Sequence, residues 1–129
     1  AAKKPLLGIC LGMQVLFEQS SEVRLCAGLG LIKGKIDLIK TGRKLPHIGW
    51  NSLDILRPCK LTAGLSGGEY VYFVHSYCAY VSDEQDLCAQ VDYDSRICAV
   101  AAHGNVFGCQ FHPEKSGETG LMILKNFGD

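Results

Sequence analysis

PLLGICLGMQ, Pro5 to Gln14, sets a cysteine between two glycines where a strand-like sequence changes to a helix-like one. The run Leu6–Ile9 is short, apolar and unbroken, which is typical of a strand inside a parallel sheet. The residues from Met13 to Glu18 predict a helix that continues to about Ser20. This stretch therefore predicts a strand, a tight turn and a helix, with Cys10 at the turn.

The pattern in Gly8–Gly12, G-x-C-x-G, is the thiol form of a nucleophile elbow. We expect small residues on both sides of Cys10, because the backbone of such a nucleophile is strained and neighbouring elements pass close to it. The turn would place the sulfur at a helix N-terminus, where the dipole favours the thiolate, and leave the Leu11 N–H to stabilise an oxyanion. The pattern also fits a structural cysteine, since free cysteines usually behave as small, buried hydrophobes.

A thiolate nucleophile needs a base, and the base needs an orienting group. His112 follows the predicted strand VFGCQ, at a strand end, where open α/β sheets present reactive groups. Glu114 is close enough to hold one imidazole nitrogen while the other faces Cys10, and Pro113 stiffens the link. Alternatively, His112 is a capping or surface histidine and Glu114 belongs to the first turn of the last helix.

The composition favours one compact core and a small-molecule or protein partner. Of 129 residues, 47% are hydrophobic and 20% are charged, and thirteen basic side chains balance thirteen acidic ones. No field is expected that would steer the chain to nucleic acid or to a membrane surface. No apolar run approaches the roughly 20 residues that cross a bilayer. Seven cysteines without a CxxC pair suit a reduced compartment, and we expect a cytoplasmic protein.

The rest of the chain predicts strands and one more helix. A glycine-punctuated loop over Gly28–Gly34 precedes a strand at Lys35–Lys40 and an extended segment at Leu45–Leu53, and Leu61–Gly68 is turn-rich. From Glu69 onward, four segments read as strands: EYVYFVHSY, CAYV, LCAQVDY and ICAVAAHGNVFGCQFH.

A hairpin turn is expected at His103–Asn105. The last helix is predicted to begin near Gly117, with an apolar stripe formed by Leu121, Met122, Leu124 and Phe127. Because most later strands read as antiparallel hairpins, we expect the parallel partners of Leu6–Ile9 to precede Ala1. Residues 1–129 would then be a single, partial domain of the α/β class, the back part of a longer one.

GICLGMQ together with FHPEKS resembles the cysteine glutaminase domain of class I glutamine amidotransferases. More narrowly, four segments resemble the glutaminase subunits of imidazole glycerol phosphate synthase, an enzyme of histidine biosynthesis: GLGLIKGKI, PHIGWNSL, YFVHSY and GCQFHPEKSGETGLMILKNF. The likeness runs from Lys4 to Phe127. It implies an open, mostly parallel flavodoxin-like sheet with an antiparallel, strand-rich C-terminal part. It also implies further strands and a glycine-rich loop before Ala1.

The resemblance implies hydrolysis of glutamine to glutamate and ammonia, without a cofactor. Cys10 would attack the side-chain amide to form a glutamyl thioester, His112 would protonate the departing ammonia and then activate water, and Glu114 would orient His112. Six more residues match substrate-contacting positions of the family: Leu11 and Gly12 at the turn, Gln14, Glu22 for the ammonium group, and Ser76 and Tyr77, whose backbone holds the α-carboxylate. Without the family match, Gln14, Glu22, Ser76 and Tyr77 could be ordinary helix, surface or strand positions.

Ammonia made at a thiolate is useful only if it reaches an acceptor, which implies a partner. In the family the partner is a (β/α)8-barrel cyclase subunit that forms a heterodimer with the glutaminase. Trp50, Tyr72 and Lys115 match its docking face, and aromatic and long basic side chains are common interface anchors. Trp50 and Tyr72 could instead be core aromatics.

The remaining histidines predict no acid, base or metal role. His47 and His75 lie in motifs of the resemblance without a direct role there, and His103 is most simply a hairpin residue. No two of them have the spacing of a metal site.

Other functions remain open at this point. The chain could be a class I amidotransferase of another pathway, an inactive fragment or binding module on the same fold, or a cysteine hydrolase that acts on peptides or small esters. A site thiol should be alkylated far faster than the other six cysteines and be protected by glutamine. If these residues were the whole protein, we would expect little glutaminase activity, because the family's second oxyanion loop lies before Ala1.

Overall fold

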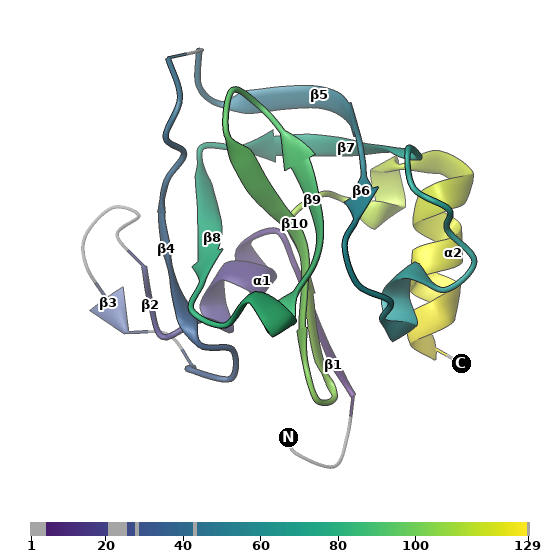
Figure 1. Ribbon diagram of the computed structural model, residues 1–129, viewed down its shortest axis with the longest axis horizontal. Helices are drawn as coiled ribbons and strands as arrows, with labels where there is room; N and C mark the ends of the chain where they lie inside the picture. The colour runs from purple at the N-terminus through teal and green to yellow at the C-terminus, as the bar shows by residue number, and fades with distance from the viewer. Residues whose placement is uncertain (1–4, 21–25, 28, 43, 129) are drawn as a thin grey trace.

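The computed structural model describes residues 5–20, 26–27, 29–42 and 44–128. Its strands form a five-stranded sheet in the order β1-β11-β10-β9-β6, a four-stranded sheet β3-β2-β4-β8 and a pair β5-β7 (Figure 1). The strands are β1 (Leu6–Ile9), β2 (Gln19–Ser20), β3 (Cys26–Ala27), β4 (Gly34–Leu38), β5 (His47–Ser52), β6 (Asp54–Ile55), β7 (Tyr70–His75), β8 (Tyr77–Val81), β9 (Leu87–Asp92), β10 (Arg96–His103) and β11 (Val106–Cys109). The helices are α1 (Leu11–Val15) and α2 (Gly117–Gly128), with 3-10 turns η1 (Lys60–Thr62), η2 (Glu84–Asp86) and η3 (Pro113–Lys115).

The predicted α/β class and the open sheets are confirmed. Among the described strands, β1–β11 and β2–β4 pair in parallel, and the other pairs are antiparallel, so parallel pairing is the smaller part of what is described. The two-residue strands β2, β3 and β6 were not predicted, because so short a segment carries no recognisable period. Within the described part of the chain, no helix has the length and apolar character to cross a membrane.

Strand β1 has one parallel neighbour downstream, which corrects, for this neighbour, the expectation that the parallel partners precede Ala1. It pairs with β11, with Ile9 opposite Cys109. The hairpin between β10 and β11 turns after His103, as predicted, and returns β11 beside β1. Because the two strands are parallel, the residues that follow them, Cys10 and Gln110, lie at the same carboxyl end of the strands.

Helix α1 ends at Val15, so the prediction of a helix to about Ser20 is wrong. The segment after Val15 makes sheet hydrogen bonds instead. The N–H of Glu18 donates to the carbonyl of Gly34 at 3.1 Å, and β2 pairs with β4. Tertiary pairing overrides the local helical preference here because Leu16 and Phe17, both buried, turn into the core.

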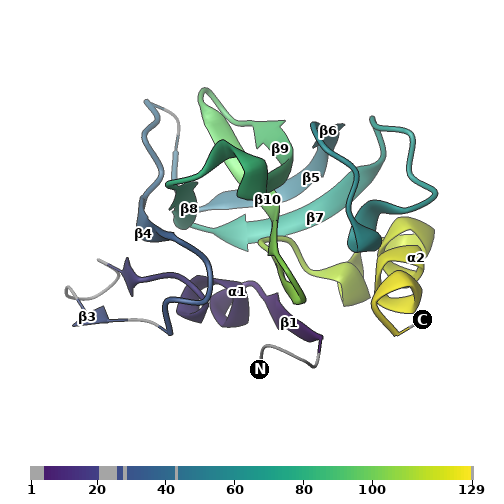
Figure 2. The same cartoon turned by 60° about the horizontal axis from the view of Figure 1, so that its bottom comes forward.

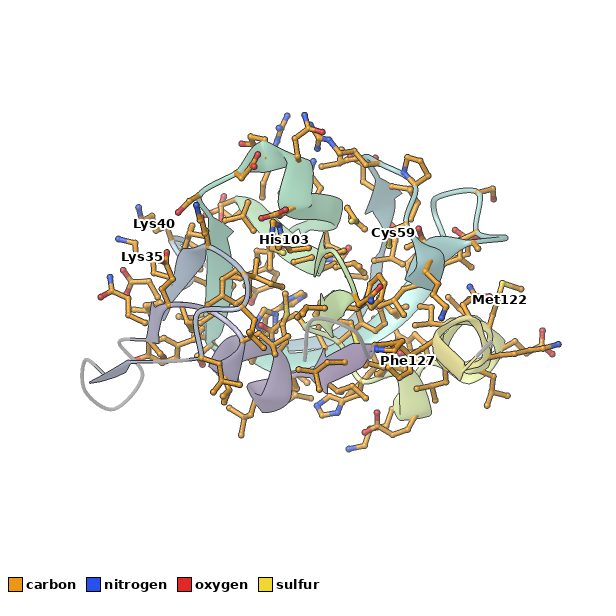
Figure 3. All side chains as sticks on the ribbon, turned by 90° about the horizontal axis from the view of Figure 1, so that it is seen from below. Lys35, Lys40, Cys59, His103, Met122 and Phe127 are labelled. Atoms are coloured by element: carbon orange, nitrogen blue, oxygen red, sulfur yellow. The ribbon has the colours of Figure 1, made fainter. Side chains whose placement is uncertain are left out.

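Helix α2 begins at Gly117 as predicted, but its buried face differs from the predicted stripe. Leu121 and Met122 are exposed, by 65% and 41%, whereas Ile123 is fully buried. Met122 is labelled in Figure 3. The reason lies at Gly120, where a Cβ would collide with the carbonyl of Pro113 in η3. Since the helix touches η3 at Gly120, the residues three and seven positions later, Ile123 and Phe127, face the core.

The core consists of two groups of buried side chains that meet at the β1–β11 edge. One group includes Phe73 of β7, Phe111 and Ile123 of α2, and the other includes Met13 of α1 and Phe17. Figure 2 shows where β7, α2 and α1 lie. A Cβ on Gly108 of β11 would lie 2.6 Å from the Met13 Cγ. Absence of a side chain at Gly108 therefore lets α1 lie against β11 and fixes the turn that carries Cys10.

Candidate active site

Cys10 has the strained backbone that the elbow pattern predicted. Its φ is 54° and its ψ is −108°, a conformation that costs most residues free energy and that is enriched at functional sites. Two hydrogen bonds hold it there. The N–H of Cys10 donates to the Cys109 carbonyl at 2.8 Å, and its carbonyl accepts from Gln14 N–H at 3.1 Å. The β1–β11 register thus imposes this turn.

The two glycines that flank Cys10 are small for different reasons. A Cβ on Gly8 would lie 2.5 Å from the carbonyl oxygen of Gly12, so a side chain at Gly8 is excluded by the backbone. A Cβ on Gly12 would meet no atom within 4 Å. The prediction of crowding is therefore right for Gly8 and wrong for Gly12, which faces open space at the front of the turn.

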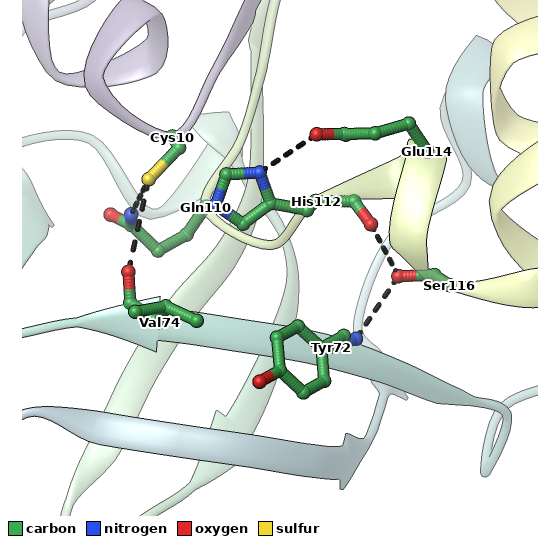
Figure 4. A network of polar contacts seen from close by, with 7 residues as sticks. All are labelled: Cys10, Tyr72, Val74, Gln110, His112, Glu114 and Ser116. Atoms are coloured by element: carbon green, nitrogen blue, oxygen red, sulfur yellow. Dashed lines mark hydrogen bonds and ion pairs between the residues drawn. The ribbon is translucent and has the colours of Figure 1, made fainter.

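Local hydrogen bonds, more than a long helix, set the surroundings of the sulfur. Helix α1 has five residues, fewer than expected, so its dipole is small and contributes less to stabilising a thiolate. The half-buried Cys10 thiol lies 4.0 Å from the Val74 carbonyl oxygen, to which it donates. On another side, the Gln110 Nε2 lies 3.7 Å from the Cys10 Sγ and donates to it (Figure 4).

Glu114 holds the imidazole of His112, as the spacing predicted. The His112 Nδ1 lies 3.0 Å from the Glu114 Oε2. Desolvation acts to raise the pKa of Glu114, but hydrogen bonds from its own backbone N–H and from His112 outweigh it, so the pKa of Glu114 lies below its usual value. The carboxylate is therefore ionised at neutral pH, and a carboxylate at Nδ1 leaves Nε2 as the nitrogen available to the site.

The main chain of His112 is anchored by Ser116, which sequence reasoning missed. The Ser116 hydroxyl donates to the His112 carbonyl at 2.6 Å and accepts from Tyr72 N–H at 3.0 Å. The N–H of His112 donates to the Tyr72 carbonyl at 3.0 Å. These bonds tie the histidine to β7.

Strand β7 contacts both the thiol of Cys10 and the main chain of His112. The Cys10 thiol contacts the carbonyl of Val74, and the N–H of His112 contacts that of Tyr72. Residues two apart in a strand are separated by about 6.6 Å. The Cys10 thiol and the His112 main chain therefore contact the same short piece of backbone, and in the view of Figure 4 the imidazole is drawn between the Glu114 carboxylate and the Cys10 sulfur.

The other substrate-contacting candidates lie in different surroundings. Gln14 and Tyr77 meet, since the Gln14 Nε2 donates to the Tyr77 carbonyl at 3.3 Å. Ser76 is half-buried between β7 and β8, and its carbonyl accepts from Ile39 N–H at 3.0 Å. The side chain of Leu11 is 62% exposed. Glu22 lies outside the described residues.

His75 and His47 form a buried pair behind the site, a contact that the sequence did not predict. The His47 Nδ1 lies 3.0 Å from the His75 Nε2, and the His75 Nδ1 donates to the Tyr77 carbonyl at 2.8 Å. Burial lowers the pKa of His75, with a smaller opposing effect of the Tyr77 hydrogen bond and a further lowering by His112. His75 is therefore uncharged at neutral pH and acts as a support for the Tyr77 backbone.

Trp50 is not a core aromatic. It is 55% exposed and lies opposite the half-buried Tyr72 in the β5–β7 pair, with ring centroids 5.7 Å apart. The register places five apolar or aromatic side chains on the same side of this pair, which we call the β5–β7 face: Ile48, Trp50, Tyr70, Tyr72 and Val74. Lys115 is exposed on η3, which packs against β7. Exposed apolar faces of this kind are typical of interaction surfaces.

Comparisons with known proteins identify relatives of the chain. The family model "Glutamine amidotransferase class-I" matches residues 1–129. The chain is 56% identical over 124 residues to the "Imidazole glycerol phosphate synthase subunit HisH" of Bacillus cereus, covering 96% of this chain and 59% of the relative. It is 52% identical over 126 residues to the protein of the same name from Caldanaerobacter subterraneus, covering 98% and 62%. The chain thus spans about 60% of the length of these curated relatives.

Solved structures support the fold alone. A structure described as a glutamine amidotransferase superposes with a TM-score of 0.67 at 20% identity, covering 97% of this chain and 61% of that one. A glutamine amidotransferase from Thermotoga maritima superposes with a TM-score of 0.62 at 22% identity, covering 97% and 47%.

Proposed function

Because the chain belongs to the class-I glutamine amidotransferase family, we propose that it carries the catalytic residues of the glutaminase subunit of an imidazole glycerol phosphate synthase. In this proposal residues 1–129 belong to a single glutaminase domain. The substrate is L-glutamine, and the ammonia passes to a cyclase subunit.

The proposed reaction uses Cys10, His112 and Glu114. The Cys10 thiolate attacks the side-chain amide carbon, and the oxyanion that forms accepts a hydrogen bond from Leu11 N–H. His112 passes a proton to the nitrogen as the C–N bond breaks, which releases ammonia and leaves a glutamyl thioester. Water then adds to the thioester while His112 takes its proton. The C–S bond breaks with its electron pair on sulfur, so that glutamine and water give glutamate and ammonia.

The observation that carries the proposal is the positive φ of Cys10 at the end of β1, beside the strand that leads to His112 and Glu114. A structural cysteine needs no such strain. Nucleophilic catalysis uses a strained nucleophile together with a base that a third group orients. The strained backbone of Cys10 and the contact between His112 and Glu114 fit these two roles. In the substrate site, the Gln14 Oε1 is buried and has no hydrogen-bond partner among the described residues, so it is a candidate acceptor for a ligand N–H.

Protection of Cys10 from alkylation tests the proposal. We expect iodoacetamide at pH 7 to modify Cys10, and L-glutamine but not D-glutamine to slow the reaction at least about tenfold, because bound substrate covers the sulfur. Peptide mass spectrometry gives the rate at each cysteine. Equal rates with and without L-glutamine would favour a binding module or another cysteine hydrolase.

The rate of labelling alone does not identify the site, because Cys59 is a second candidate for fast reaction (Figure 3). The pKa of Cys59 is lowered to about 6. The largest cause is a hydrogen bond from Cys88, and hydrogen bonds from Thr62 lower the pKa further, whereas desolvation opposes them. Burial raises the pKa of Cys78 to about 11 and raises those of Cys98 and Cys109 as well. The variant Cys59→Ala removes this background, and Cys59 in the unaltered chain provides an internal rate that glutamine should not change.

We place the cyclase partner on the β5–β7 face and Lys115. The carbonyls of Val74 and Tyr72 contact Cys10 and hold His112, while the side chains of the same strand form the face. A partner docked there would therefore lie against the strand that sets the geometry of the site. The apolar centre with a basic residue beside it is typical of protein interfaces.

Trp50→Ala is expected to weaken binding to the cyclase subunit about 30-fold, because a half-exposed tryptophan at the centre of such a face fits a hot spot. The cyclase subunit of the Bacillus cereus synthase is a suitable partner, and calorimetry measures the Kd. Leu38→Ala on β4, which removes a side chain that is 46% exposed on another sheet, serves as the control. Equal Kd values for the two variants would remove Trp50 from the interface.

A further inference from the structure

Gln110 is a fully buried polar residue whose role neither the motifs nor the proposed triad explains. It follows β11, its exposed fraction is 0%, and its N–H donates to the Ala99 carbonyl at 2.9 Å. Glutamine is rarely buried unless its amide is satisfied by defined partners. Its amide reaches two of them, Gln14 and Cys10.

The orientation of the Gln110 amide follows from the Tyr77 carbonyl. The Gln14 atom that lies 3.3 Å from this carbonyl must be the nitrogen, because a carbonyl oxygen only accepts hydrogen bonds. The same Gln14 nitrogen lies 3.2 Å from the Gln110 amide, so the Gln110 atom that faces it must be the oxygen. The Gln110 nitrogen is then the atom at 3.7 Å from the Cys10 Sγ. A backbone carbonyl thus fixes two amides and aims an N–H at the sulfur.

An N–H donor at this place favours the ionised thiol. A hydrogen bond to the charged form stabilises it, whereas the Val74 carbonyl on another side can bond only to the S–H form. Cys109 from β11 interacts electrostatically with Cys10, Glu114 from η3 with Cys109, and His112, which precedes η3, with His75 from β7, while α1 contains no titratable residue. The contact between Gln110 and Cys10 is made by an uncharged N–H group. Because an amide does not titrate, Gln110 remains the donor at every pH in the working range.

We propose that Gln110 is a catalytic residue that donates a hydrogen bond to the sulfur of Cys10, favours the thiolate before substrate binds, and receives the thiolate again when the thioester is hydrolysed. In attack, the sulfur electron pair forms the C–S bond, and the Gln110 contact weakens because the sulfur becomes neutral. In hydrolysis, water adds to the acyl carbon, and the electron pair of the breaking C–S bond returns to the sulfur beside the Gln110 N–H. The catalytic part of this inference depends on the proposed glutaminase function, but the contact with the sulfur does not.

Gln110→Met tests the contact, since methionine has a similar shape and no N–H. Gln14 keeps its bond to the Tyr77 carbonyl in this variant. We expect the pH midpoint of Cys10 alkylation by iodoacetamide to rise by about one unit, and the rate at pH 7 to fall up to about tenfold. Glutamine hydrolysis, measured on the protein expressed from its complete reading frame, should fall by about tenfold or more.

Gln90→Met is the matched control, because Gln90 is also a buried glutamine. Its amide donates to Asp54 of β6, the strand at the opposite end of the five-stranded sheet from β1. Gln90→Met should leave the Cys10 midpoint unchanged. The labelling rate of Cys59 in each sample reports whether the fold is intact. An unchanged Cys10 midpoint in Gln110→Met, with the Cys59 rate unaltered, overturns the proposal.

A second variant decides the case in which Gln110→Met alters the fold. Gln110→Glu keeps an oxygen for the Gln14 N–H and presents a carboxylate oxygen to the sulfur, so the Cys10 midpoint must rise further than with methionine. A midpoint at the original value places Gln110 away from the sulfur and overturns the proposal. If the midpoints shift as expected but no variant or unaltered protein hydrolyses glutamine, the proposed function fails and the contact stands.

Discussion

Cys10→Ala is expected to reduce glutamine hydrolysis by about a thousandfold or more, the largest effect that we predict for activity. Removal of the nucleophile from a covalent mechanism leaves only binding and oxyanion contacts, and such losses reach several orders of magnitude. The measurement is ammonia release from L-glutamine in the presence of the cyclase subunit. The protein should be expressed from its complete reading frame.

Cys59→Ala is the matched control for this prediction. Cys59 is also a half-buried free thiol, and its pKa is lowered to about 6, so it shares the chemical reactivity expected of a nucleophile. It caps η1 and lacks the strained backbone of Cys10. Activity should therefore persist in Cys59→Ala. Comparable activity in Cys10→Ala would contradict thioester chemistry at Cys10.

Gly8→Ala and Gly12→Ala are expected to change stability in opposite directions, although both add one methyl group beside Cys10. At Gly8 the Cβ would lie 2.5 Å from the Gly12 carbonyl oxygen, which belongs to the backbone and cannot move without opening the turn. We expect a loss of about 3 kcal/mol in the free energy of unfolding. At Gly12 the space is open, and alanine within α1 should add about 0.5–1 kcal/mol.

Urea unfolding followed by circular dichroism measures this difference as a shift in midpoint at constant slope. Each variant serves as the control of the other, because chain entropy in the unfolded state changes alike in both. Equal stability of Gly8→Ala and the unaltered chain would show that the turn is not closed by the contact between Gly8 and Gly12.

Local patterns were sufficient where a single segment decides the structure. The apolar run Leu6–Ile9 formed β1 with its predicted bounds, and the hairpin at His103 and the start of α2 at Gly117 agree with the sequence. The contact between His112 and Glu114 was predicted from a spacing of two residues. Each of these features depends on residues that are neighbours in the chain, so its physical cause is present in the local sequence.

Predictions failed where distant segments compete for the same residues. The helix predicted to Ser20 ended at Val15 because β4 paired with the following residues. The stripe predicted on α2 was displaced because Gly120 meets η3 and turns Ile123 inward. The missed residues share this origin. Gln110 could have been noticed as one polar residue in the apolar run VFGCQF, but its partners lie 96 and 100 positions away.

The sequence by itself determined the type of chemistry: a cysteine in an elbow pattern, and a histidine with a carboxylate two residues on. Only the tertiary structure decided how these residues are placed, because parallel pairing of β1 with β11 sets Ile9 opposite Cys109 and joins Cys10 N–H to the Cys109 carbonyl, and the carbonyls of β7 contact both the Cys10 thiol and the main chain of His112. The tertiary structure alone also gave the sulfur its amide donor. A side-chain type and a short spacing are properties of the local chain, whereas a hydrogen bond between residues a hundred positions apart exists only after the sheets have formed.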